Sequence, residues 1–162
     1  MAITVTVAVE KGGVGKTTTC VNLAAAMAAA GKKVLAVDMD TQANCTYFLT
    51  GNKKRTEAYK NRGVAEMLRA YGLVEPGAFI HPTQIPGVDI IPSNAASVTL
   101  PETLNTLAQN YADSKNRFLA YCLAKVSEGY DYVLIDTPPN LEVMTASALL
   151  AADYLLMPFN AE

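Results

Sequence analysis

A glycine-rich loop between a short apolar run and a long alanine-rich stretch constrains the fold of this chain more than any other feature. Small residues let the backbone curl around an anion, so that N–H groups at the start of the following helix point at it. Lys16 adds a positive charge, and Thr17 offers a hydroxyl to a magnesium ion that bridges the phosphates. A phosphate-binding P-loop is therefore predicted at Lys11, Gly12, Gly13, Val14, Gly15, Lys16, Thr17 and Thr18.

The start of the loop departs from the usual P-loop pattern. That pattern has a glycine five residues before Gly15, whereas this chain has Glu10 at that position and a second lysine, Lys11, after it. From the residues alone, Lys11 is either a solvated loop lysine or a second positive charge for a bound phosphate.

Size and composition indicate one globular domain. The chain has 162 residues, of which 51% are hydrophobic, and this is enough for a core. The net charge of −2 argues against a strong nucleic-acid binder. No apolar run reaches the roughly 20 residues that span a bilayer, and no signal peptide precedes the first apolar run, so we expect a cytoplasmic protein. The three cysteines share no metal-ligand spacing and are expected to be reduced and structural.

Short β-branched runs alternate with longer helical patterns along the chain. Strands are expected at residues 3–9, 34–38, 78–80, 88–91, 132–136 and 154–157. Helices are expected at residues 16–30, 64–70, 101–110, 115–128 and 141–152. Gly31 is placed to end the first helix, and Ser114 to cap the fourth. Most of the polar stretch at residues 41–62 is expected to form a mobile surface connection, with a bound ligand as the element that could order its start.

The alternation of strands and helices predicts a three-layer α/β fold with a mainly parallel sheet, of the P-loop NTPase class. We expect residues 1–162 to lie in a single domain. The last predicted strand, 154–157, reads as buried, but no covering helix follows it, and it would be left as a bare edge. We therefore expect the chain to be the N-terminal part of a longer domain, truncated at its C-terminus.

Polar residues follow three of the expected strands. The first strand leads into the P-loop, the second ends at Asp38 and is soon followed by Asp40, and a later one ends at Asp136. Because ligands collect at the carboxyl ends of parallel strands, we expect these residues to converge. An apolar run that ends in Asp is typical of a Walker B strand, in which a rigid carboxylate faces the shell of the metal. The joint pattern predicts nucleotide binding.

Four segments together resemble a known family. They are Lys11–Thr19, Val21–Ala24, Val37–Asn44 and Asp136–Pro139. Their pattern is similar to the deviant Walker ATPases of the ParA/MinD group, and closest to the partition-type ParA branch (Soj-like). One departure is Thr41, where the family commonly has proline, so the loop after Asp40 is expected to be less rigid.

The resemblance implies an ATPase that uses ATP and Mg²⁺. Lys11 matches the signature lysine that reaches the ATP of a partner subunit, and Lys16 matches the lysine that grips the β and γ phosphates. Asp40 matches the residue that positions the attacking water. Lys11, Lys16 and Asp40 are therefore the expected catalytic residues.

The resemblance also implies a magnesium site. Thr17 matches the magnesium ligand, and Asp38 and Asp136 match carboxylates near the magnesium shell. Thr18 matches an additional phosphate contact. For Asp38, the alternative is an aspartate that caps a turn at the end of its strand.

A switch in chromosome or plasmid partition is the function that the resemblance implies. The chain would form a homodimer with ATP, and its slow hydrolysis would time the switch. The implied partners are a ParB-like activating protein and non-specific DNA, the latter through a C-terminal part outside this chain, which would give nucleoid association. No helix-turn-helix fits before the first strand, so sequence-specific DNA reading is not expected.

Two other functions stay open. A MinD-like spatial regulator would act at a membrane or on protein partners, but no amphipathic C-terminal helix occurs before Glu162. A metabolic P-loop enzyme, such as a dethiobiotin-synthetase-like ligase, explains Lys16 and Thr17 but leaves Lys11 and residues 38–44 without a purpose.

The remaining candidates have simpler explanations. His81 is expected to be a loop histidine without a site role. The basic stretch at residues 53–62 either touches nucleic acid or is a solvated charge run. Cys45 has no second cysteine spaced for an iron–sulfur site. The core is expected to include Met67, Phe118 and Tyr121.

Overall fold

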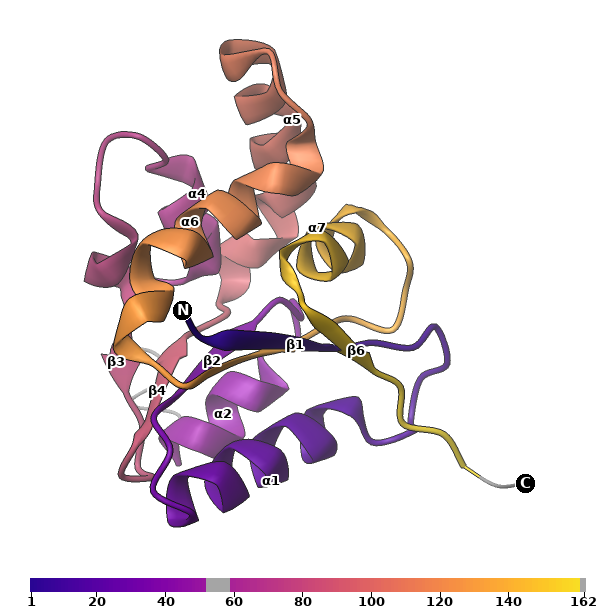
Figure 1. Cartoon of the computed structure of the whole chain (residues 1–162). Coiled ribbons are helices and arrows are strands. Elements are labelled where there is room, and N and C mark those ends of the chain that lie inside the picture. Colours follow the sequence, from indigo (N-terminus) through magenta and orange to yellow (C-terminus); the bar gives the residue numbers. More distant parts are fainter. Residues whose placement is uncertain (52–58, 161–162) are drawn as a thin grey trace.

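The structure, a computed structural model, describes residues 1–51 and 59–160. Within these residues one sheet is covered by helices on both faces (Figure 1). The strands are β1 (Ile3–Val7), β2 (Val34–Asp38), β3 (His81–Pro82), β4 (Val88–Ile91), β5 (Tyr132–Asp136) and β6 (Tyr154–Leu156). The α-helices are α1 (Lys16–Ala29), α2 (Asn44–Thr50), α4 (Val64–Arg69), α5 (Leu100–Tyr111), α6 (Phe118–Val126) and α7 (Val143–Ala151). The 3-10 helices are η1 (Pro76–Phe79), η2 (Ala95–Thr99), η3 (Lys115–Arg117) and η4 (Ser127–Gly129).

The order of the strands brings the predicted site together. The sheet runs β3-β4-β2-β5-β1-β6, and every neighbouring pair is parallel except β3 and β4. This confirms the predicted mainly parallel three-layer α/β fold. Strand β5 lies between β1 and β2, so the P-loop, Asp38 and Asp136 leave adjacent strand ends. Asp38 and Asp136 are register partners.

Alternate residues of each central strand build two separate cores. In β2, Val34 and Ala36 pack with α1 and α2, whereas Leu35 and Val37 pack with α4, α5, α6 and α7. Figure 1 shows these two groups of helices on opposite faces of the sheet. All four side chains are fully buried, as expected for a parallel strand covered on both faces.

The expected surface connection at residues 41–62 was wrong in its first part, because residues 44–50 form α2. Cys45 and Leu49, one helical turn apart, are fully buried against Cys20 and the sheet. Burial of this narrow apolar face stabilises α2. Polar residues interrupt its apolar pattern, so the helix is hard to recognise in the sequence. Most of the basic stretch lies at residues 53–58, outside the described residues.

The strand expected at residues 78–80 was also wrong. Residues 76–79 form η1, in which Pro76 stands in the first turn, where its missing N–H costs nothing. The strand follows as β3. It contains His81, which is buried rather than in a loop, and whose Nε2 lies 3.0 Å from the Arg62 carbonyl oxygen.

The last strand is present but not buried, which corrects the prediction for residues 154–157. Tyr154 is 63% exposed and Leu155 is 47% exposed. Among the described residues β6 pairs only with β1, so its other edge has no neighbouring strand to cover it. The expectation of an edge strand is confirmed for this part of the chain.

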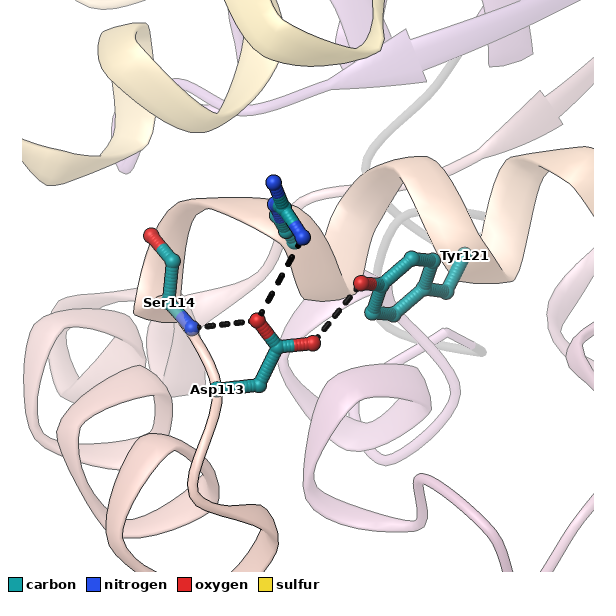
Figure 2. Close-up of polar contacts among 4 residues, drawn as sticks. Asp113, Ser114 and Tyr121 are labelled. Carbon is teal, nitrogen blue, oxygen red and sulfur yellow. Dashed lines mark hydrogen bonds and ion pairs between the residues drawn. The ribbon is translucent and has the colours of Figure 1, made fainter.

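Ser114 stands at the predicted cap position, before η3, but its side chain makes no capping hydrogen bond. The preceding residue, Asp113, makes the hydrogen bonds of this connection instead (Figure 2). Its Oδ1 accepts from the Ser114 N–H at 2.6 Å, and its Oδ2 accepts from the Tyr121 hydroxyl at 2.7 Å. The Tyr121 hydrogen bond, followed by that of Ser114, lowers the pKa of Asp113 below its ordinary value. The link from α5 to α6 therefore depends on Asp113.

Candidate nucleotide-binding site

Two positions in the loop between β1 and α1 require glycine. Gly13 has φ 74° and Gly15 has φ 87°, in the left-handed region where other residues are strained. A Cβ at either position would meet no heavy atom within 4 Å, so the requirement is conformational rather than steric. Gly15 is also the N-cap of α1, and the first turn of α1 contains no side-chain cap and no acidic residue. This helix end is therefore suited to an anion.

The two lysines of the loop differ in their exposure to solvent. Lys16 is only 7% exposed, and its Nζ donates to the Lys11 carbonyl oxygen at 3.1 Å. The Lys16 ammonium thus lies inside the curl of the loop, where a phosphate would replace the carbonyl as its partner. The side chain of Lys11 is exposed at the surface.

Asp136 and Thr17 form the second part of the site. The Thr17 hydroxyl donates to Asp136 Oδ2 at 2.7 Å. Asp136 Oδ1 is buried without a hydrogen-bond partner. Burial, and next the nearby charge of Asp38, raises the pKa of Asp136 to about 7. A buried carboxylate oxygen without a partner needs a cation or a donor from a ligand.

Asp38 is more completely enclosed. It is fully buried, and burial raises its pKa to about 6 even though hydrogen bonds from Thr46 and Asp40 lower it. Its Oδ1 accepts from the Asp40 N–H at 3.0 Å, and its Oδ2 accepts from the N–H and the hydroxyl of Thr46 at 2.8 and 2.7 Å. All three bonds come from the chain that follows β2.

A pocket of about 430 Å³ opens over the P-loop. Asp40 lines it, is 8% exposed, and accepts from the Gln42 N–H at 3.0 Å through Oδ1. Lys16 and Asp40 are thus brought to one pocket, whereas Lys11, Val14, Asp38 and Asp136 do not line it. The lining residues are Gly12, Gly13, Gly15, Lys16, Thr17, Thr18, Asp40, Asn44, Phe48 and Pro139.

Three lining residues were missed in the sequence: Asn44, Phe48 and Pro139. Asn44 and Phe48 are four residues apart on α2, so both lie on one face of the helix, next to the face that carries Cys45 and Leu49. Recognising α2 in the sequence would have revealed this pair. Pro139 lies three residues after Asp136, in the segment 136–139 that carries the family resemblance, and this was the available signal.

The residues present fit a magnesium ion held together with phosphates. Thr17 and Asp136 supply oxygen atoms, which Mg²⁺ prefers, and Asp136 Oδ1 lacks a partner. Within the described ranges, no three His, Cys, Asp or Glu side chains are grouped to hold a metal by themselves. Such a site is typical of Mg²⁺ bound by one or two protein oxygens, water and substrate phosphates.

Two other sequence predictions concern residues outside the pocket. Tyr59, within the basic stretch, is 9% exposed and packs on His81 with ring centroids 4.3 Å apart. It therefore does not offer a stacking face to nucleic acid. The three cysteines are free and buried. None of the helices among the described residues has the length and apolar character of a membrane-spanning segment.

The sequence profile of the family described as "AAA domain" matches residues 2–162. The chain belongs to this family. The AAA domain is 36% identical over 158 residues to the chromosome partitioning protein ParA of Caulobacter vibrioides, covering 96% of this chain and 55% of the relative. It is 38% identical over 157 residues to the chromosome-partitioning ATPase Soj of Thermus thermophilus, covering 94% and 53%. The AAA domain therefore spans just over half the length of these relatives, and its resemblance to the ParA-type P-loop ATPases is confirmed.

A solved structure supports the fold of this AAA domain. The cobyrinic acid a,c-diamide synthase of Mycobacterium smegmatis, crystallised with an ATP analog and magnesium, superposes with a TM-score of 0.86 at 33% identity. The match covers 100% of this chain and 62% of the synthase chain. It confirms the P-loop NTPase fold. The ligands in that crystal are of the class that the sequence predicts here.

Proposed function

We propose that this AAA domain binds ATP with Mg²⁺, dimerises in the ATP-bound form and hydrolyses ATP slowly, as a switch in chromosome or plasmid partition. The observation that carries the proposal is the convergence of Lys16, Thr17 and Asp40 at one pocket, with Asp136 hydrogen-bonded to Thr17 behind it. Its relatives, a partitioning ParA and a Soj ATPase, support the biological role.

The chain's own residues would divide the work of phosphoryl transfer. The P-loop N–H groups and Lys16 hold the phosphates, and Asp40 orients the attacking water. Thr17 and Asp136 would hold the magnesium ion, which supplies charge neutralisation at the phosphates. Asp38 is proposed to belong to the surroundings of this magnesium site. Such chemistry depends on positioning and electrostatics rather than on a covalent intermediate.

Lys11 is proposed to act in the partner subunit. Its side chain is exposed and does not line the pocket of its own subunit. A positive charge delivered from a second copy would couple ATP occupancy to dimerisation, in the manner of an arginine finger. We propose a ParB-like activating protein and non-specific DNA as further partners, and the cytoplasm, with association to the nucleoid, as the location.

The first test is ATP-dependent dimerisation and hydrolysis in three variants. Lys16→Ala should weaken ATP binding by roughly 100-fold, because a charge-assisted phosphate contact is lost. Asp40→Ala should bind ATP and dimerise but hydrolyse about 100-fold more slowly. Lys11→Ala should bind ATP as a monomer. Sedimentation with ATP or ADP, nucleotide titration and phosphate release measure the three quantities.

Lys32→Ala is the matched control, since Lys32 is an exposed lysine outside the pocket. It should behave as the parent. Parental hydrolysis by Asp40→Ala would contradict the role of Asp40. If Lys11→Ala dimerises and hydrolyses ATP as the parent does, Lys11 does not act in the partner subunit, and the loop is an ordinary P-loop.

A further inference from the structure

The Asp38 carboxylate spans the loop that carries Asp40. One of its oxygens accepts from the N–H of Asp40, just after β2, and the other accepts from the N–H and hydroxyl of Thr46 on α2. The three distances lie between 2.7 and 3.0 Å. Asp38 therefore ties both ends of the loop to the end of β2.

Thr46 is itself held in one orientation. It is fully buried, and its hydroxyl oxygen accepts from the Ser93 N–H at 2.9 Å. Because the Ser93 N–H can only donate, the Thr46 hydroxyl proton is directed to Asp38. Ser93 lies just after β4, the strand next to β2, so the bond ties Thr46 to the end of a second strand.

The loop between these two ends has a conformation that needs support. Ala43 has φ 54°, a left-handed conformation that is unfavourable for alanine. Strained backbone persists where the surrounding structure over-determines it. The bonds from Asp38 to Asp40 and Thr46 bracket Ala43 and supply that constraint.

We propose that Asp38 and Thr46 form a clamp that sets the position of Asp40 at the pocket, and that Thr46 is a positioning residue for hydrolysis. The effect of Thr46 on hydrolysis rests on the proposed function. The clamp itself is a property of the ligand-free protein. Thr46 does not line the pocket, so it acts through Asp38 and the loop. It is expected to affect turnover and not nucleotide affinity.

Thr46→Val keeps the shape of the side chain and removes its hydroxyl. We expect it to lower kcat about 10-fold while the affinity for ATP with Mg²⁺ changes less than 2-fold. Thr46→Ser should restore most of the turnover, because the hydroxyl returns. Thr50→Val is the matched control: Thr50 is buried on the same helix, but its hydroxyl donates to the Thr46 carbonyl oxygen and not to Asp38.

Amide hydrogen exchange of the ligand-free protein tests the clamp without hydrolysis. In the parent, the amides of Asp40 and Thr46 should exchange as slowly as those of β2, and Thr46→Val should accelerate both at least 10-fold. Thr50→Val should leave the Asp40 amide unchanged. Fast exchange at Asp40 and Thr46 in the parent overturns the clamp, even if Thr46→Val does not fold.

The two measurements separate the two proposals. A parent that neither binds nor hydrolyses ATP, but shows the expected exchange pattern, contradicts the proposed function and leaves the clamp supported. Parental kcat in Thr46→Val, an equal loss in Thr50→Val, or no recovery in Thr46→Ser overturns Thr46 as a positioning residue.

Discussion

At the scale of residues, the site holds two carboxyl groups whose surroundings oppose their ionisation. The pKa of Asp38 is raised from 3.8 to about 6, and that of Asp136 from 3.8 to about 7, mainly by burial. Between about pH 4 and 7 the folded protein therefore binds more protons than the unfolded chain. Their contribution to stability is complete below about pH 4 and is lost as the pH rises through 6 and 7. A bound cation would offset that loss by favouring the ionised forms.

Asp136→Asn should flatten this pH dependence in the ligand-free protein. The variant cannot carry the buried negative charge, so its free energy of unfolding at about pH 8 should exceed that of the parent by on the order of 2 kcal/mol, with little difference at about pH 5. Urea unfolding at the two pH values, with a chelator present, measures it. Glu102→Gln is the control at an exposed position. Its free energy of unfolding should change with pH as that of the parent does. An unchanged slope in Asp136→Asn would argue against a raised pKa.

At the scale of elements, α2 connects the loop that carries Asp40 to the core. One face carries Asn44 and Phe48 at the pocket, and the neighbouring face buries Cys45 and Leu49 beside α1. The helix has seven residues, too few to be stable alone, so it depends on this packing. Its sequence was interpreted as a loop because Thr and Asn surround only two buried apolar residues. The longer pattern of α1 was recognised, and its predicted end lies one residue beyond the observed end at Ala29.

Leu49→Ala should lower the free energy of unfolding by about 2–5 kcal/mol, because a fully buried side chain is replaced by a cavity. Tyr47→Ala is the control on the same helix. Tyr47 is 46% exposed, and its removal should cost less than about 1 kcal/mol. Urea denaturation followed by circular dichroism measures both. Equal losses in the two variants would contradict the packing of α2 against the core.

At the scale of the whole molecule, the two edges of the sheet differ. At one edge β3 is only two residues long, and His81 is buried there. At the other, β6 exposes apolar side chains, and Figure 1 shows it at the margin of the sheet, next to β1. Uncovered apolar edge strands favour association. The exposed large apolar residues near this edge are Leu149, Leu150, Tyr154, Leu155, Met157 and Phe159.

Leu155→Lys should therefore reduce self-association of the 162-residue chain in the absence of nucleotide. Lysine on an edge strand opposes pairing with another chain, and a side chain that is 47% exposed can be replaced at a cost below about 1 kcal/mol. Light scattering over a concentration series measures the effect. Leu73→Lys, at a position that is 84% exposed and distant in the sequence, is the control. An equal reduction in both variants would show a general effect of charge.

The sequence by itself determined the parallel α/β fold, the P-loop and the acidic ends of β2 and β5. These follow from local patterns: left-handed glycines before a helix, and apolar runs that end in Asp. Only the tertiary structure decided that 44–50 is helical, that β6 is exposed, that Thr46 holds Asp38, and that Asp136 keeps an oxygen without a partner. Each of these depends on packing and burial that arise only when the elements assemble, so no local pattern in the sequence indicates them.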